Sequence, residues 1–169
     1  YRGYTLLVSN SGNIAHLIDM EGRICHEWRS DEGISYGYLL PNGNLLLRTG
    51  PAAEETSFLS RPERNLVPGG GRTTSGAILE LDWDSNVVWE YRYPFLHHDF
   101  ERLPNGNTLV LVWKSLPEEL AAQVKGGYTD GSEPGQMLGD AVMEVTAGGE
   151  VVDEWRSWEH LSLEEDTIC

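Results

Sequence analysis

Short runs in which apolar and polar residues alternate predict β-strands over most of the chain. The alternation is clear in segments 78–81 (ILEL) and 142–145 (VMEV), and a period of two residues is typical of strands with one buried face. We expect three strands within segment 4–28. Further strands are predicted at 33–40, 44–49, 77–82, 87–93, 96–103, 107–114, 141–147 and 150–156.

Two sequence motifs recur along the chain with the same spacing. The motif Leu-Pro-Asn-Gly-Asn occupies 40–44 and returns 63 residues later at 103–107. The second motif is a turn followed by an apolar strand that ends in Trp or Tyr. It occupies 18–28, returns 63 residues later at 81–91, and returns again 64 residues later at 145–155. Two separate motifs with one period indicate a repeat protein.

Each repeat holds four predicted strands joined by tight turns. Asn-Gly between two apolar runs favours a hairpin, because these residues tolerate the positive φ angles of a tight turn. Four antiparallel strands repeated at a fixed period are typical of a β-propeller blade. We therefore predict an all-β fold and a single domain over 1–169, a partial β-propeller of four-stranded antiparallel blades. Its parts are an incomplete blade at 1–30, blades at 31–93 and 94–158, and a connector to a missing blade at 159–169.

The chain therefore holds about two and three-quarter predicted blades, whereas a propeller closes with about four to eight. We expect the remaining blades in missing sequence or in another chain. Two insertions separate the second and third strands of the blades. Segment 50–76, rich in Pro, Gly and Ser, is predicted to be a loop. Segment 115–125 is predicted to be a short helix, because Pro and acidic residues begin it and a glycine follows it.

The net charge of −15 narrows the range of partners. The chain has 27 acidic against 12 basic residues, whereas nucleic acids and anionic membrane surfaces bind basic faces. We therefore expect no nucleic acid and no membrane as a partner. The glycine run at 69–71 lacks the lysine of a phosphate-binding loop. Segment 82–86 (DWDSN) is interpreted as a hairpin turn, because the other repeats have a turn at the same place.

A chemically demanding sequence, His97-His98-Asp99, breaks the repeat. The positions equivalent to the histidines in the preceding blade are Ile34 and Ser35, so the scaffold alone does not require them. They begin the innermost predicted strand, which in a propeller borders the central channel. Because neighbouring strand residues point to opposite faces, we expect one imidazole to face the channel, with His98 favoured. Asp99 is expected to share a side with His97 and to fix its tautomer.

Two other interpretations of the histidine pair stay open. The rings have a structural role if they hydrogen-bond the backbone between blades. A metal site is the second interpretation, but no other ligands cluster beside the pair in the sequence, and no metal or cofactor is predicted. His16, His26 and His160 occupy scaffold or edge positions and are predicted to face solvent.

The repeats and the histidine segment together resemble the arylsulfotransferase family. The resemblance extends over essentially all 169 residues and is most specific in segment 96–109, LHHDFERLPNGNTL. It implies a six-bladed propeller that moves a sulfuryl group between phenolic compounds, through a histidine intermediate and without a nucleotide donor. It assigns the HHD histidine to the group that binds the sulfuryl oxygens. It places the nucleophilic histidine, and a His-x-Asn motif, beyond residue 169, so the chain alone is expected to be inactive.

We thus predict catalytic roles for His98 and His97 and substrate-binding roles for Asp99 and Arg102, with a small phenolic substrate. Preorganised N–H donors stabilise the negative charge that a sulfuryl group carries in transfer. Because the chain is acidic, such a site needs local positive charge, for which Arg48 and Arg102 are candidates. Two alternatives stay open: a propeller that binds a small ligand or protein without catalysis, and a family member adapted to hydrolysis or elimination. The resemblance also makes a periplasmic or extracellular location an expectation.

Overall fold

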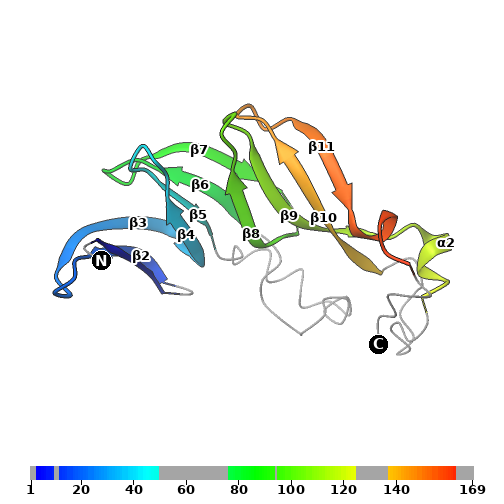
Figure 1. Ribbon diagram of the computed structural model, residues 1–169, viewed down its shortest axis with the longest axis horizontal. Helices are drawn as coiled ribbons and strands as arrows, with labels where there is room; N and C mark the ends of the chain where they lie inside the picture. The colour runs from blue at the N-terminus through cyan, green and yellow to red at the C-terminus, as the bar shows by residue number, and fades with distance from the viewer. Residues whose placement is uncertain (1–2, 10–11, 50–75, 94, 125–136, 163–169) are drawn as a thin grey trace. The chain divides into compact units, whose positions relative to one another are not determined.

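The computed structural model describes residues 3–9, 12–49, 76–93, 95–124 and 137–162 (Figure 1). In this part of the chain the strands pair antiparallel in three sheets, with orders β1-β2-β3, β4-β5-β6-β7 and β11-β10-β9-β8. The predicted all-β class is confirmed, and two of the three sheets have four antiparallel strands in sequence order, as is typical of a propeller blade. The elements are β1 (Thr5–Val8), β2 (Gly12–Ile18), β3 (Ile24–Ile34), β4 (Tyr36–Leu39), β5 (Leu45–Arg48), β6 (Ala77–Leu81), β7 (Val87–Arg92), β8 (Leu96–Arg102), β9 (Thr108–Ser115), α2 (Glu118–Ala121), β10 (Leu138–Val145), β11 (Val151–Arg156) and the 3-10 turn η3 (Ser157–Glu159).

The boundaries differ most from the sequence prediction at β3, at α2 and at β10, which occupies Leu138–Val145 and not 141–147. Strand β3 continues to Ile34, so the start of the predicted strand 33–40 belongs to β3 and not to β4. The predicted helix at 115–125 is reduced to the single turn of α2. Residues 50–75 of the loop predicted at 50–76 lie outside the described residues. Residues 163–169 of the connector predicted at 159–169 also lie outside them. Neither helical segment of the described chain has the length and apolar character that crossing a membrane requires.

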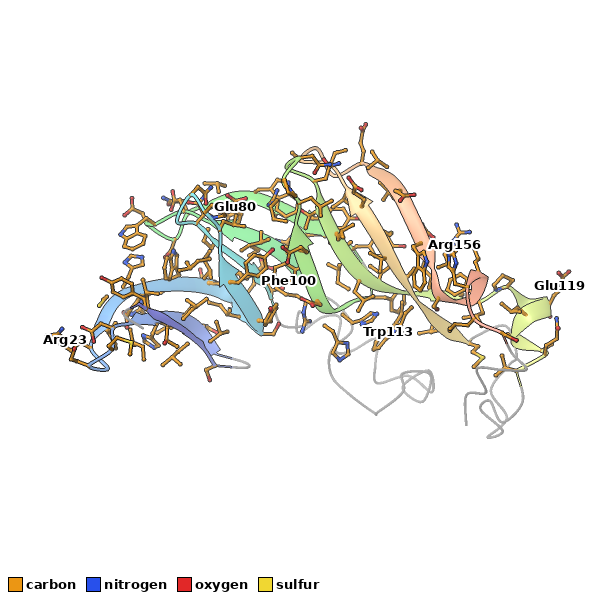
Figure 2. The ribbon with its side chains drawn as sticks, in the orientation of Figure 1. Arg23, Glu80, Phe100, Trp113, Glu119 and Arg156 are labelled. Atoms are coloured by element: carbon orange, nitrogen blue, oxygen red, sulfur yellow. The ribbon has the colours of Figure 1, made fainter. Side chains whose placement is uncertain are left out.

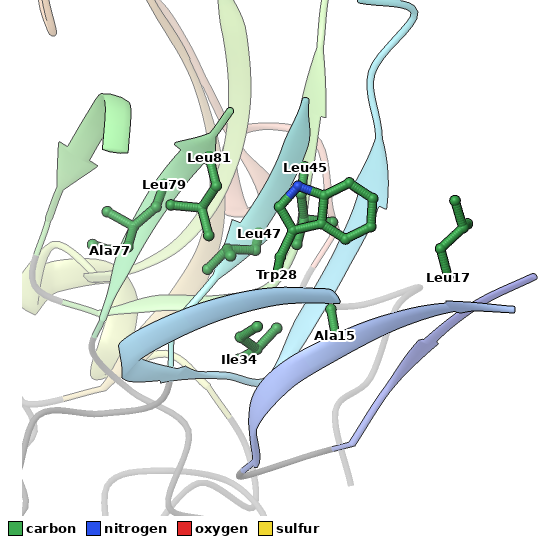
Figure 3. Packing of buried hydrophobic residues seen from close by; sticks show 9 residues of the cluster. All are labelled: Ala15, Leu17, Trp28, Ile34, Leu45, Leu47, Ala77, Leu79 and Leu81. Carbon is green, nitrogen blue, oxygen red and sulfur yellow. The ribbon is translucent and has the colours of Figure 1, made fainter. Parts of the chain in front are cut away.

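The chain forms two compact units, of which the first holds the sheets β1–β3 and β4–β7. The two sheets of this unit pack through one apolar cluster (Figure 3). Trp28 is fully buried, and its Nε1–H donates a hydrogen bond of 3.1 Å to the Asp82 carbonyl oxygen. Arg92 on β7 forms a two-pronged ion pair with Glu32 on β3, at 2.7 and 2.8 Å. The members of the cluster are Ala15, Leu17, Trp28, Ile34, Leu45, Leu47, Ala77, Leu79 and Leu81.

The repeated Leu-Pro-Asn-Gly-Asn motif forms a hairpin turn in both units, as predicted. Gly43 and Gly106 both have a φ of 88°, which an L side chain rarely adopts. The last asparagine of each motif fastens the turn to the third strand of its sheet. Asn44 Nδ2 lies 2.7 Å from Glu80 Oε1, and Asn107 Nδ2 lies 2.6 Å from Glu144 Oε1. The motif therefore recurs because it closes each blade in the same way.

The turn at 82–86 is a hairpin turn, as the repeat predicts. Asp82 Oδ1 accepts hydrogen bonds from the backbone N–H groups of Asp84 and Asn86. Hydrogen bonds from Asn86 lower the pKa of the Asp82 carboxyl below its usual value. Its carboxylate is thus engaged in ordering the turn. Within the described residues, no group of three or more His, Cys, Asp and Glu side chains is arranged to hold a metal ion.

Candidate functional site

The second unit contains the sheet β8–β11, and its inner strand is irregular at the histidine pair. Leu96 pairs with Val112 and Phe100 pairs with Val110, so β8 carries two more residues than β9 between these pairs. Phe95 and His98 both adopt positive φ angles, 69° and 47°. Histidine adopts a positive φ more often than most residues, but for a bulky residue such as Phe95 this conformation is an outlier. Outliers of this kind cluster at functional sites. The bulge re-aims the side chains at 97–99.

The bulge brings the two imidazoles together. His97 Nδ1 and His98 Nδ1 lie 2.9 Å apart, and the ring planes are nearly perpendicular, at 85°. His97 is 3% exposed and stacks on Trp113, with ring centroids 4.3 Å apart and planes 20° apart. His98 is exposed. Trp113 lies near the end of β9 (Figure 2). The buried His97 ring, which stacks on Trp113, therefore supports the exposed His98 ring.

The carboxylate beside the pair comes from β10. Asp140 pairs with Trp113 across the sheet, and its Oδ1 lies 3.3 Å from His97 Nε2. The side chain of Asp140 is 57% exposed. The site thus consists of His98, His97, Asp140 and Trp113, contributed by three adjacent strands.

The structure corrects two details of the sequence-based interpretation. The two imidazoles do not point to opposite faces, because the bulge and the positive φ of His98 end the strand alternation there. Asp99 is not the carboxylate at His97. Its Oδ1 instead accepts a hydrogen bond of 2.9 Å from the Phe100 backbone N–H. Asp140 occupies the place that the sequence assigned to Asp99.

Arg102 lies at the other end of β8 from the histidines. It pairs with Thr108 beside the turn, and its Nη1 donates a hydrogen bond of 3.1 Å to the Gly106 carbonyl oxygen. Four residues of extended strand span roughly 13 Å. The structure therefore does not bring Arg102 together with His98, and its predicted substrate-binding role stays a prediction.

Asp99 borders a cavity of about 240 Å³ on the same sheet. The other lining residues are Phe100, Glu101, Leu109, Val110, Leu111 and Val142. Most of these side chains are apolar. Asp99 is thus adjacent in sequence to His98 and also contributes to this hollow.

The other histidines match their predicted scaffold positions in differing degree. His160 is exposed and stacks on Trp155, whereas His26 is only partly exposed and stacks on Trp83. His16 is only partly exposed, and its Nδ1 lies 3.0 Å from Glu27 Oε1.

Sequence reasoning missed Trp113 and Asp140, although the repeat carries a signal for both. In the preceding blade the equivalent positions are Gly50 and Gly76. Trp113 and Asp140 therefore replace glycines of the preceding blade, and they do so in the same blade that carries the two histidines. A comparison of every repeat position, and not only of the histidines, would have found them.

The comparisons with known proteins bear mainly on the second unit. The arylsulfotransferase (ASST) family model matches residues 90–169, which include His97, His98, Trp113 and Asp140. No curated protein matches the chain. Among solved structures, the chain is similar to a protein of unknown function from Bacteroides caccae, with 16% identity and a TM-score of 0.47. That similarity covers 90% of this chain and 42% of the other, so the chain spans less than half the length of that protein.

Proposed function

We propose, on the premise that residues 90–169 match the arylsulfotransferase family, that the chain is part of a sulfotransferase-like enzyme. In this proposal the enzyme moves a sulfuryl group between phenolic compounds, and His98 contacts that group. The observation that carries the proposal is the Nδ1–Nδ1 contact of 2.9 Å between an exposed and a buried histidine. The carboxylate of Asp140 stands 3.3 Å from the far nitrogen of the buried ring.

The contacts set the protonation of the two rings. The negative charge of Asp140 favours a hydrogen on His97 Nε2, so His97 Nδ1 accepts the hydrogen bond that His98 Nδ1–H donates. His98 Nε2 is then the atom of the pair left for a ligand. A hydrogen on His98 Nε2 makes that atom an N–H donor.

A hydrogen on His98 Nε2 suits the binding of a sulfuryl group. The group carries negative charge on its oxygens during transfer, and a positioned N–H donor stabilises that charge. The proposal assigns His97 to hold His98, because His97 is buried against Trp113. Asp99 is assigned to the substrate side, because it borders the apolar cavity.

The proposed reaction has two half-reactions. In the first, a histidine nitrogen forms an N–S bond as the donor's S–O bond breaks, and the departing phenolate takes up a proton. In the second, the acceptor phenol loses a proton, its oxygen forms an S–O bond, and the N–S bond breaks. A covalent intermediate of this kind gives ping-pong kinetics. The family resemblance assigns the covalent step to a histidine other than the HHD pair.

The test is sulfuryl transfer from p-nitrophenyl sulfate to phenol by the protein that carries this chain. We expect the double variant His97→Ala/His98→Ala to lose at least about 100-fold in turnover, since loss of one oxyanion donor alone costs roughly that much. The matched control is His160→Ala, which removes an exposed histidine of the same unit and should leave turnover unchanged. Unchanged turnover in the double variant would contradict the proposal.

A further inference from the structure

We infer that Arg48, in the first unit, binds a small oxyanion, namely a sulfate or phosphate group, free or as an ester. Arg48 is the last residue of β5 and is only 7% exposed. Within the described residues, its Nε and Nη1 atoms are buried and have no hydrogen-bond partner. Buried polar atoms are nearly always satisfied, so the guanidinium points to a ligand. This inference does not rest on the proposed function.

A buried arginine without an acceptor is costly. Burial lowers the pKa of Arg48 below its usual value, yet an arginine side chain stays charged in proteins. A charge out of water requires a partner of opposite sign close by. Because the buried Arg48 guanidinium has no acidic partner among the described side chains, we infer that an anion from outside the chain takes that position.

The polar groups around Arg48 are already engaged with other partners. Glu80 on β6 pairs with Leu46, which lies two residues before Arg48 on β5. The Glu80 carboxylate, however, accepts hydrogen bonds from Asn42 and Asn44. The Ser35 hydroxyl lies within hydrogen-bond distance of the backbone carbonyls of Arg48 and Thr49. These groups order the backbone beside Arg48 and do not supply the missing acceptor.

The repeat offers a control for this position. The residue equivalent to Arg48 in the next blade is Leu111, so an apolar side chain is compatible with the blade template. A buried charge that the scaffold does not require needs a functional reason. Tyr36, which pairs with Arg48 from the edge strand β4, is 44% exposed, and the inference has the ligand enter from this side.

The guanidinium chemistry selects the ligand class. Arginine presents planar N–H donors that match the oxygens of sulfate and phosphate, and its hydrogen bonds to such groups are charge-assisted. These bonds are stronger away from bulk water. A chain with a net charge of −15 repels anions at long range, so binding depends on these short contacts.

The experiment is isothermal titration of the chain with sodium sulfate, with sodium chloride at equal ionic strength as the reference. We expect wild type to bind one sulfate and Arg48→Leu, which installs the leucine of the next blade, to bind none. Arg23→Leu is the matched control, because it removes an arginine whose side chain is 73% exposed, and its binding should equal that of wild type. Sodium phosphate and an alkyl sulfate, titrated separately, distinguish the free anion from the ester.

Thermal unfolding provides the second readout. At sulfate near 100 times its Kd, the melting temperature of wild type should rise by about 5–10 °C relative to chloride. The general stabilisation by sulfate appears in Arg48→Leu as well and is subtracted. If Arg48→Leu does not fold, Arg48→Lys keeps the charge without the planar donors and should bind at least about tenfold more weakly. Absence of binding by wild type, or equal binding by the Arg48 variants, would overturn the inference.

Discussion

Replacing Trp28 with alanine is expected to cost about 3–5 kcal/mol in free energy of unfolding. The indole is fully buried between the two sheets of the first unit. It contacts the rings of His26 and Trp83 edge-on, at centroid distances of 4.3 and 5.3 Å. Its loss removes these contacts, leaves a cavity, and removes one of two donors to the Asp82 carbonyl oxygen, which also accepts a hydrogen bond from the Ser85 backbone N–H.

The repeat supplies a matched control for this substitution. Trp155 occupies the equivalent position two repeats later, but it is 43% exposed. It stacks on His160 with centroids 4.8 Å apart, and an aromatic pair of this kind contributes about 0.5–1.5 kcal/mol. We therefore expect Trp155→Ala to cost no more than about 1.5 kcal/mol.

The assay is urea unfolding followed by far-ultraviolet circular dichroism, because the substitutions alter tryptophan fluorescence. The midpoint should fall with little change in the slope of free energy against urea. A Trp28→Ala cost as small as that of Trp155→Ala would refute the reasoning, since it would mean that the two sheets of the first unit do not pack around Trp28.

Three further predictions concern turns and ion pairs. Gly106→Ala should cost about 1 kcal/mol in free energy of unfolding, because the φ of 88° is unfavourable for alanine. No atom lies within 4 Å of the new Cβ, so the cost comes from the backbone alone. Urea unfolding measures this cost, and an unchanged midpoint would contradict the prediction. Asn44→Ala should cost about 1.5–3 kcal/mol by removing the hydrogen bond to the Glu80 carboxylate, and a cost near zero in the same assay would show that the turn is not fastened there. The hydrogen bond from Lys114 holds the pKa of Glu154 below its ordinary 4.5, so the pair stabilises the fold above pH 4.5 and this contribution is lost as the pH falls through the lowered pKa. Glu154→Gln should therefore flatten the decline of the melting temperature below pH 4.5, and an unchanged acid decline would contradict the assignment.

The strands and hairpins could be predicted because their signals are local. Alternation and the Asn-Gly turns placed β5, β6 and β7 within a residue or so of their observed bounds. The Asn44–Glu80 hydrogen bond joins residues 36 positions apart. No local sequence pattern predicts this hydrogen bond. The recurrence of the Asn and the Glu one repeat later, as Asn107 and Glu144, does indicate it.

The site was only partly predictable because its geometry depends on a bulge. The sequence singled out His97 and His98 as departures from the repeat, but it treated segment 96–103 as a regular strand. A positive φ at His98 depends on tertiary packing and has no marker such as glycine. Asp140 joins the site through its pairing with Trp113, and a pairing between distant strands is known only once the register is known.

The most direct test of the proposed site is a crystal structure of the protein with p-nitrobenzenesulfonate, an analogue whose sulfur cannot be transferred. The account predicts a sulfonate oxygen within about 2.7–3.2 Å of His98 Nε2, with His98 Nδ1 still in contact with His97. A bound sulfonate that makes no contact with His98, in crystals where the ring is accessible, would contradict the account.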